Sequence, residues 1–232
     1  MQFRLDNHET ITLTIQRKPR MKHLYLRITP DGVVVSANRR TKLADIEAFV
    51  YSKSAWLRKH LKVQEIDQEK RKIITGNEVY FKGDAWVLQC NEEVSVQIPS
   101  IALEAKTLTL TLPKPSSQEE RQRLLDGFYN EYAITEITPL VDRWSKRMNL
   151  YPSKIGFRRA KRRWGSCSSQ NALSFNYYLM KLPLPLIEYV VVHELSHIQE
   201  KNHSMRFWAL VEQFLPNYKE LIEALREFER RI

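Results

Sequence analysis

The chain has 232 residues, which is enough for one or two domains with hydrophobic cores of their own. Hydrophobic residues make up 43% and charged residues 28%, a balance that excludes collagen-like, low-complexity and disordered classes. The sequence contains no apolar run of the roughly 18 residues that a membrane span needs, so we expect a cytoplasmic protein without a membrane partner.

Positive charge is concentrated in one part of the sequence. Against 27 Asp+Glu the chain has 37 Lys+Arg, a net charge of +10. No acidic residue lies between Asp142 and Glu188, and ten basic residues fall in that window. Such a stretch is typical of a solvated surface, but it also fits contact with phosphates or nucleic acid. Both interpretations of the 143–187 stretch stay open.

The first third of the chain is predicted to be mostly β-structure. Residues 11–15 and 24–28 alternate apolar and polar side chains with period two, which is typical of strands. A Pro-Asp-Gly turn signal at 30–32 precedes the apolar run 33–35 and indicates a hairpin. From 43 to 71 the spacing becomes helical and indicates one or two helices.

Four further short strands are predicted before residue 113. They are 80–81, 86–88, 94–98 and 108–112. We therefore expect residues 1–112 to form a β-rich N-terminal region with one or two helices. The sequence shows no internal repeat.

The segment 113–117, Pro-Lys-Pro-Ser-Ser, is the clearest linker signal in the chain. Ser117 with Glu120 three residues on forms a capping box, which predicts the start of a helix. Apolar residues at three-to-four spacing continue this helix, with a bend expected at Pro139. A domain boundary at this linker would leave a second domain at 117–232.

The second domain is predicted to contain a small sheet and several helices. Residues 155–159 indicate a strand, 164–177 indicate a hairpin, and helical periodicity begins near Leu186. The predicted fold class of the whole chain is therefore α+β.

The helix near Leu186 carries the pattern His-Glu-x-x-His. Four residues advance a helix by roughly 400° and about 6 Å, so the imidazoles of His193 and His197 project side by side and can bind one cation. Glu194 is turned by about 100° around the axis, which suits a general base that acts on water better than a third ligand. The spacing predicts a ligand pair and a catalytic carboxylate.

A catalytic Zn²⁺ usually takes three protein ligands and one water, so a further ligand is needed. His203 is the candidate, because Lys201-Asn202 before it indicates a helix stop in which Asn adopts the left-handed conformation. A lone histidine is more often structural, but three of the six histidines lie within eleven residues, which favours a zinc site. Phe207 and Trp208 are expected to be core side chains that fix the segment carrying His203.

Two motifs of the chain are Arg163-Trp164-Gly165-Ser166-Cys167 and, after it, the run from His193 to Trp208. Both motifs, in this order, resemble those of the YgjP-like metallopeptidases, distant relatives of the SprT-like proteases. The resemblance covers nearly the whole chain and is most specific over 125–225. It implies a zincin-like domain of the minimal gluzincin type, in which the HExxH helix packs on a small sheet, Zn²⁺ lies on His193, His197 and His203, and Glu194 is the acid/base.

In zincins a strand beside the cleft pairs with an extended peptide substrate. The resemblance puts this strand in the hairpin 164–177, with substrate contacts at Arg163, Trp164 and Asn176. Packing is the alternative for Trp164 and Cys167, because a buried cysteine usually behaves as a small hydrophobic residue. A Cys167 thiolate on the zinc ion also stays open.

Three functions from different classes fit these features. The first is a zinc metallopeptidase that acts on peptides or on proteins attached to nucleic acid. The second keeps the metal but hydrolyses nucleoside triphosphates, as a UTP pyrophosphatase, with Arg158, Arg159, Arg162 and Arg163 on the phosphates. The third is a binding module without catalysis, in which zinc is structural and the basic stretch contacts nucleic acid.

Overall fold

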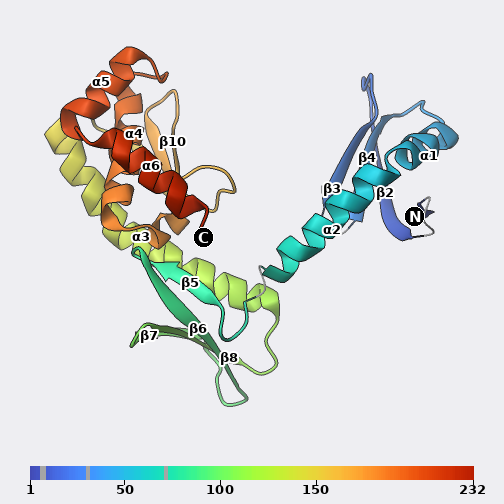
Figure 1. Ribbon diagram of the computed structural model, residues 1–232, viewed down its shortest axis with the longest axis horizontal. Coiled ribbons are helices and arrows are strands. Elements are labelled where there is room, and N and C mark those ends of the chain that lie inside the picture. The colour runs from blue at the N-terminus through green and yellow to red at the C-terminus, as the bar shows by residue number, and fades with distance from the viewer. Residues whose placement is uncertain (6–8, 30–31, 71–72) are drawn as a thin grey trace. The chain divides into compact units, whose positions relative to one another are not determined.

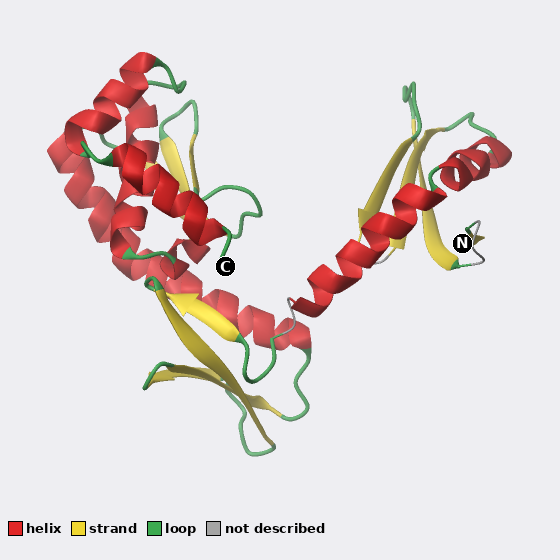
Figure 2. Ribbon diagram, in the orientation of Figure 1, coloured by secondary structure: helices red, strands yellow, loops and turns green. Residues whose placement is uncertain are grey.

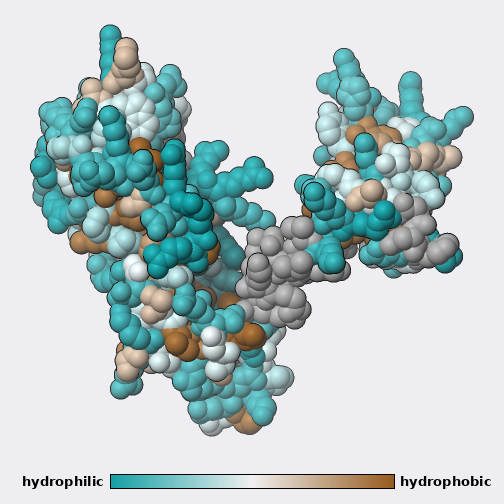
Figure 3. Space-filling model, in the orientation of Figure 1, coloured by the Kyte–Doolittle hydropathy of each residue, from teal (hydrophilic) through white to brown (hydrophobic). Residues whose placement is uncertain are grey.

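The computed structural model describes residues 1–5, 9–29, 32–70 and 73–232, and it has the predicted α+β fold (Figures 1 and 2). The chain divides into two compact units, Met1–Lys72 and Ile73–Ile232. No helix in these described ranges is both long and apolar enough to cross a lipid bilayer. Polar residues cover most of the visible face of both units (Figure 3).

The first unit is a four-stranded sheet covered by two helices. Its elements are β1 (Gln2–Arg4), β2 (Thr10–Lys18), β3 (Tyr25–Thr29), β4 (Gly32–Asn38), α1 (Leu43–Ser52) and α2 (Ser54–Lys70). The strand order is β1-β2-β4-β3, in which β2 and β4 are parallel and the other neighbours are antiparallel. Alternate side chains of β2 and β4, such as Leu13 and Val33, bury against Ile46 and Val50 of α1.

The hairpin predicted at 30–32 is confirmed by the pairing of its strands. Thr29 of β3 lies opposite Gly32 of β4, while Pro30 and Asp31 of the turn lie outside the described residues. Gly32 has φ +124°, and a Cβ there would lie 2.5 Å from the carbonyl oxygen of Thr12. The turn therefore requires glycine both for its backbone conformation and for the close approach of β2.

A second four-stranded sheet begins the second unit. Its strands are β5 (Glu78–Phe81), β6 (Asp84–Glu93), β7 (Ser100–Glu104) and β8 (Thr107–Pro113). The order β5-β6-β8-β7, with β6 and β8 parallel, is the topology of the first sheet. Leu13 lies opposite Val33, and Val87 opposite Thr107, so partners in both parallel pairs are twenty positions apart.

The sequence showed no internal repeat, yet the sheet topology is repeated. Sheet topology depends on the positions of turns and on alternation of buried side chains, and both can recur without recurrence of the residues themselves. The structure therefore reveals that the two four-stranded sheets share one topology, which a comparison of residue identities does not show.

The strand predicted at 94–98 is wrong. This segment is the loop between β6 and β7, and its side chains Val94 and Ile98 are 86% and 83% exposed. Alternating apolar residues form a strand only where a neighbouring strand pairs with their backbone and a core buries their side chains. No strand of the described chain pairs with this loop.

The boundary predicted at 113–117 lies inside the second unit. The buried side chains Leu108 and Leu110 of β8 share one hydrophobic cluster with Leu125 and Phe128 of α3 (Gln118–Met148). The segment is thus a tight connection between β8 and α3, and the division between units falls at 72/73. Its capping box is confirmed: the Ser117 backbone N–H donates to Glu120 Oε2 at 2.7 Å, and the Glu120 N–H donates to Ser117 Oγ at 3.2 Å.

The remaining elements form a small sheet and the helices around it. They are β9 (Lys154–Arg158), β10 (Gly165–Cys167), β11 (Ala172–Asn176), the 3₁₀ helix η1 (Tyr177–Lys181), α4 (Leu184–Gln199), α5 (Met205–Phe214) and α6 (Tyr218–Glu229). The strand order β10-β11-β9 confirms the predicted hairpin and leaves β10 at an edge. Helix α4 contacts β10, α3, α5 and α6, so it lies at the centre of the unit.

Candidate metal centre

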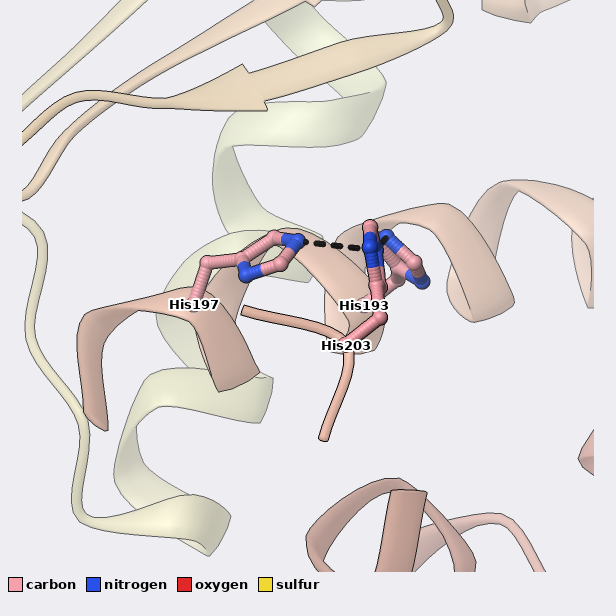
Figure 4. Close-up of side chains that lie close together, drawn as sticks. All are labelled: His193, His197 and His203. Carbon is pink, nitrogen blue, oxygen red and sulfur yellow. Dashed lines mark hydrogen bonds between the residues drawn. The ribbon is translucent and has the colours of Figure 1, made fainter. Parts of the chain in front are cut away.

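Three histidines converge at the end of α4 (Figure 4). His193 and His197 project from the helix, and His203 approaches from the segment between α4 and α5. The His203 Nε2 atom lies 3.0 Å from His193 Nε2 and 3.2 Å from His197 Nε2. The helical spacing therefore brings the first two rings together, and the return of the chain brings the third.

The chain turns back to His203 without a left-handed residue. Helix α4 ends as Glu200 adopts an extended backbone with φ −117° and ψ 101°, and Asn202 has no positive φ, contrary to the expected stop. The Ser204 N–H donates to the Asn202 carbonyl at 2.7 Å, and Ser204 Oγ then caps α5 by accepting from the Phe207 N–H at 3.3 Å. Hydrogen bonding around Ser204 thus replaces the predicted Asn turn.

The rings are held in place by aromatic side chains of α5. The buried ring of Phe207 packs against all three imidazoles, with centroid distances of 4.9, 4.5 and 4.8 Å to His193, His197 and His203. Trp208 stacks on His203 at 5.7 Å and on Tyr218 of α6 at 5.3 Å. These two residues anchor the segment that carries His203, as the sequence suggested.

Hydrogen bonds at the far side of two rings orient their Nε2 atoms. His197 Nδ1 lies 3.0 Å from the carbonyl oxygen of Glu200, which can only accept, so the Nδ1–H donates and Nε2 keeps its lone pair. His193 Nδ1 lies 3.4 Å from the hydroxyl of Tyr189. Burial, with His197 and His203 nearby, lowers the pKa of His193 to about 3, and burial also lowers the pKa of His197. Both rings are therefore neutral at neutral pH, the form that binds a metal.

The donor set fits zinc in chemistry and spacing. Zn–N bonds of about 2.0–2.1 Å at tetrahedral angles separate two ligand nitrogens by about 3.3 Å, close to the 3.0 and 3.2 Å found here. The described part of the chain adds no fourth ligand to the three histidines. Cys167 is outside the cluster, and its Sγ lies 3.8 Å from Lys201 Nζ. Three imidazoles with one open position are typical of a catalytic rather than a structural zinc site.

The side chain of Glu194 projects from α4 toward β10, and its carboxyl is almost completely buried there. The residue is 6% exposed, and its Oε2 atom has no hydrogen-bond partner in the described structure. Burial raises the pKa of Glu194 to about 7, against the lowering effect of the Arg163 cation. A Cβ on Gly165 of β10 would lie 2.5 Å from Glu194 Cγ and 2.7 Å from its Oε1. Only glycine at 165 leaves room for this carboxyl.

The three histidines open onto two adjoining cavities along β10. One, of about 250 Å³, has Tyr189, His193 and Glu194 in its wall. The other, of about 360 Å³, contacts all three histidines as well as Lys201 and Cys167. Arg163 and Gly165 line both, so these cavities form one cleft that follows the edge strand.

The predicted substrate contacts fall into two groups. Arg163 and Trp164 line the cleft, and the Trp164 Nε1–H donates to Glu229 Oε1 of α6 at 2.5 Å. Asn176 is 6% exposed, and its Nδ2 donates to the carbonyl oxygens of Ala160 at 2.9 Å and Arg163 at 3.3 Å. Its side chain therefore holds the loop before β10 rather than facing the cleft.

Two residues at the site were not singled out for it from the sequence. Tyr189 precedes His193 by four positions and so shares its side of α4, a spacing that could have indicated contact with the imidazole. Gly165 interrupts a predicted strand, which often marks a close approach to the backbone. Both signals are local, but neither identifies its partner without the fold.

The basic stretch 143–187 extends over several elements of the second unit. Its residues are distributed over α3, β9, the loop before β10 and η1. Arg143 forms an ion pair with Glu188, and Arg159 forms one with Asp126 at 3.1 Å. Part of its charge is therefore neutralised within the fold.

Comparisons with known proteins identify a family for this chain. The profile of the family described as "YgjP-like, metallopeptidase domain" matches residues 22–228. The crystal structure of the metallopeptidase zymogen abylysin of Pyrococcus abyssi is similar at 20% identity and a TM-score of 0.36, over 38% of this chain and 90% of that chain. The crystal structure of the metallopeptidase zymogen jannalysin of Methanocaldococcus jannaschii is similar at 23% identity and a TM-score of 0.36, over 42% of this chain and 98% of that chain. No curated protein gives a significant match.

Proposed function

Because the chain belongs to the YgjP-like metallopeptidase family, we propose that it is a zinc-dependent peptidase in which His193, His197 and His203 hold the metal and Glu194 is the general base. The convergence of three Nε2 atoms on a cleft that also contains a buried carboxyl carries this proposal. A structural metal would need a fourth ligand, which the described residues do not supply.

Glu194 supplies the proton transfers of the proposed reaction. A zinc ion held by the three imidazoles would lower the pKa of water and polarise the carbonyl of the scissile bond. The Glu194 carboxylate takes one proton from the attacking water while the water oxygen forms a bond to the carbonyl carbon. Glu194 then gives that proton to the amide nitrogen as the C–N bond breaks. A carboxyl whose pKa burial raises to about 7 suits both transfers at neutral pH.

The other residues of the site position these groups. Phe207 keeps the imidazoles in contact with one another, and the Glu200 carbonyl fixes the tautomer of His197. The edge strand β10 offers its unpaired side to an extended peptide, which would bind by main-chain hydrogen bonds with little sequence specificity. A peptide placed there would run along the cleft and pass Glu194.

Two variants test the proposal on the zinc-loaded protein, with casein and nucleoside triphosphates as separate substrates. Glu194→Gln is expected to retain one zinc ion per chain and to lose casein hydrolysis by about 10²–10⁴-fold, the usual contribution of a general base. His197→Ala should lose the metal as well, whereas His23→Ala, in the first unit, should retain both properties. Zinc content and initial rates are the measurements.

Two results would contradict the proposal. If Glu194→Gln hydrolysed casein at an undiminished rate, Glu194 would not be the general base. Hydrolysis of triphosphates but not of casein would make the chain a nucleotide pyrophosphatase that uses the same metal site.

A further inference from the structure

A third cavity, of about 480 Å³, adjoins the cleft at the N-terminal end of β10. It shares Arg162, Arg163 and Trp164 with the cavity that contains His193 and Glu194. Four cationic side chains line it, and Glu229 is the only carboxylate side chain among the described residues of its wall. The cations are Lys161, Arg162, Arg163 and Lys181. We call this space the basic cavity.

The cations of the basic cavity do not form salt bridges with the described carboxylates. No ion pair in the described part of the chain includes any of its four cations. Glu229 accepts a hydrogen bond from Trp164, and the nearby Asp126 pairs with Arg159 at 3.1 Å and accepts from the Tyr178 hydroxyl at 2.5 Å. An anion that enters the cavity would therefore meet cations that form no salt bridge with a carboxylate.

Lys181 is the most enclosed of these cations. Its Nζ lies 4.7 Å from the ring centroid of Tyr178 and 5.9 Å from that of Tyr129, so two aromatic faces hold the ammonium group. Burial, with Arg159 nearby, lowers the pKa of Lys181, an effect that a bound anion would oppose. Asp126 acts in the opposite direction, but its carboxylate is already paired with Arg159. A half-buried ammonium group that forms no salt bridge of its own favours the binding of an anion.

The loop that carries the other three cations is held by hydrogen bonds from Asn176. Asn176 Nδ2 donates to the carbonyls of Ala160 and Arg163, and the Asn176 backbone N–H donates to the Trp164 carbonyl at 2.7 Å. The backbone of residues 160–164 is thereby fixed at both ends before any ligand binds. Such preorganisation reduces the entropy lost on binding.

We propose that the basic cavity binds a carboxylate of the substrate, either an acidic side chain or the C-terminal carboxylate of a peptide extended along β10. The inference rests on the proposed function, because that function places the scissile bond beside Glu194. The cavity lies where such a peptide passes the N-terminal end of β10. It would therefore favour a carboxylate at one peptide position, on one side of the scissile bond. Arg162 and Lys181 are specificity-determining residues in this arrangement.

The test measures binding separately from catalysis. Zinc-loaded Glu194→Gln protein is titrated with fluorescent peptides of neutral sequence that are blocked at both ends and carry a single Glu at successive positions. Each is compared with its Gln counterpart, and a further neutral peptide carries a free C terminus. At one position, or at the free C terminus, the carboxylate should tighten binding by about tenfold, as one charge-assisted hydrogen bond provides.

Variants assign the effect to the cavity. In the same background, Arg162→Gln should reduce the preference for the carboxylate, and Arg162→Gln with Lys181→Met should remove it. Lys146→Gln with Lys154→Gln, two exposed cations outside the cavity, changes the net charge equally and should leave the preference intact. Arg162 is itself exposed, so its variant keeps the test informative even if substitution of Lys181 disturbs folding.

The outcomes separate this inference from the proposed function. Equal affinity for Glu and Gln peptides and for free and amidated termini would overturn it, as would a preference that survives both cavity variants. Tight binding of a nucleoside triphosphate together with equal affinity for the paired peptides would assign the cavity to phosphates and also overturn it. A carboxylate preference that depends on Arg162, in a protein whose wild-type form cleaves no peptide, would support the subsite and contradict the peptidase function.

Discussion

The two units of this chain are built on the same sheet but differ in what covers it. Both contain four strands in one topology, with a parallel central pair whose partners are twenty positions apart. The first unit adds only α1 and α2, whereas the second adds α3, a three-stranded sheet and α4 to α6. Within the described residues, a cluster of side chains that could hold a metal ion is found only in the second unit. The candidate metal site therefore belongs to the elements that the second unit adds, and not to the sheet that both units share.

The units also differ in charge. Residues 1–72 contain 16 basic and 8 acidic residues, a net charge of +8, and residues 73–232 contain 21 and 19, a net charge of +2. Most of the excess positive charge thus lies in the unit that lacks the cluster of three histidines. Arg17 in that unit donates to the carbonyl oxygens of Asn38, Arg39 and Thr41, so part of the charge has a structural role. Net charge alone does not locate the site.

Equivalent core substitutions should separate the units most strongly. Leu13 on β2 and Leu88 on β6 are both buried beside the parallel partner of their strand. Replacement by Ala should destabilise the affected unit by about 2–5 kcal/mol. We expect Leu13→Ala to unfold the first unit with zinc content unchanged, and Leu88→Ala to weaken zinc binding. Hydrogen exchange resolved by segment and zinc analysis measure both, and loss of zinc in Leu13→Ala would show that the units are not independent.

Glu194→Gln should stabilise the metal-free second unit at alkaline pH. The unfolded carboxyl ionises near pH 4.5, whereas burial raises its folded pKa to about 7. The folded state therefore loses stability as pH rises from 4.5 to 7, and above pH 7 the full penalty applies, about 3 kcal/mol. Gln carries no such penalty, so the variant should gain about that amount at pH 8 and almost nothing at pH 4.

Urea unfolding in the presence of a chelator, followed by tryptophan fluorescence, measures this difference. Four of the five tryptophans lie in the second unit: Trp86, Trp144, Trp164 and Trp208. A gain that is equal at both pH values would mean that the carboxyl is not buried in the metal-free protein.

Removal of zinc should destabilise one unit only. At a free zinc concentration 100 times the dissociation constant, binding to the folded state contributes about 2.7 kcal/mol. Chelation should therefore lower the unfolding transition of the second unit and leave that of the first unchanged, as differential scanning calorimetry would show. An equal shift of both transitions would place a metal ligand in each unit.

The three-stranded sheet, which only the second unit possesses, is expected to tolerate a new Cβ at one glycine and not at another. Gly165→Ala should displace the Glu194 carboxyl and reduce peptide hydrolysis by about tenfold or more, because overpacking of about 1–3 kcal/mol must be relieved there. Gly156→Ala, in β9 of the same sheet, is the matched control, since a Cβ there meets no atom within 4 Å. Zinc content should be unchanged in both variants. Equal rates for the two would show that the carboxyl tolerates displacement.

Local regularities in the sequence determined much of the second unit. The spacing of His193 and His197 fixed their proximity, because an α-helix places residues four apart on one side whatever surrounds it. Alternation and turn signals predicted most strands, and Ser117 with Glu120 predicted the start of α3. These features depend on neighbours within one turn or one hairpin, so the sequence specifies them directly.

Contacts between distant segments decided the rest. The third imidazole reaches the other two because Phe207 packs against all of them, and Glu194 is buried because Gly165 of a separate strand leaves room for it. The residues 73–112 belong to the second unit because their leucines pack on α3, although a proline-rich segment separates them in the sequence. The repeated sheet is likewise visible only in the folded chain. Sequence specified what each segment becomes, and tertiary packing decided which segments meet, because burial free energy depends on surfaces that no single segment contains.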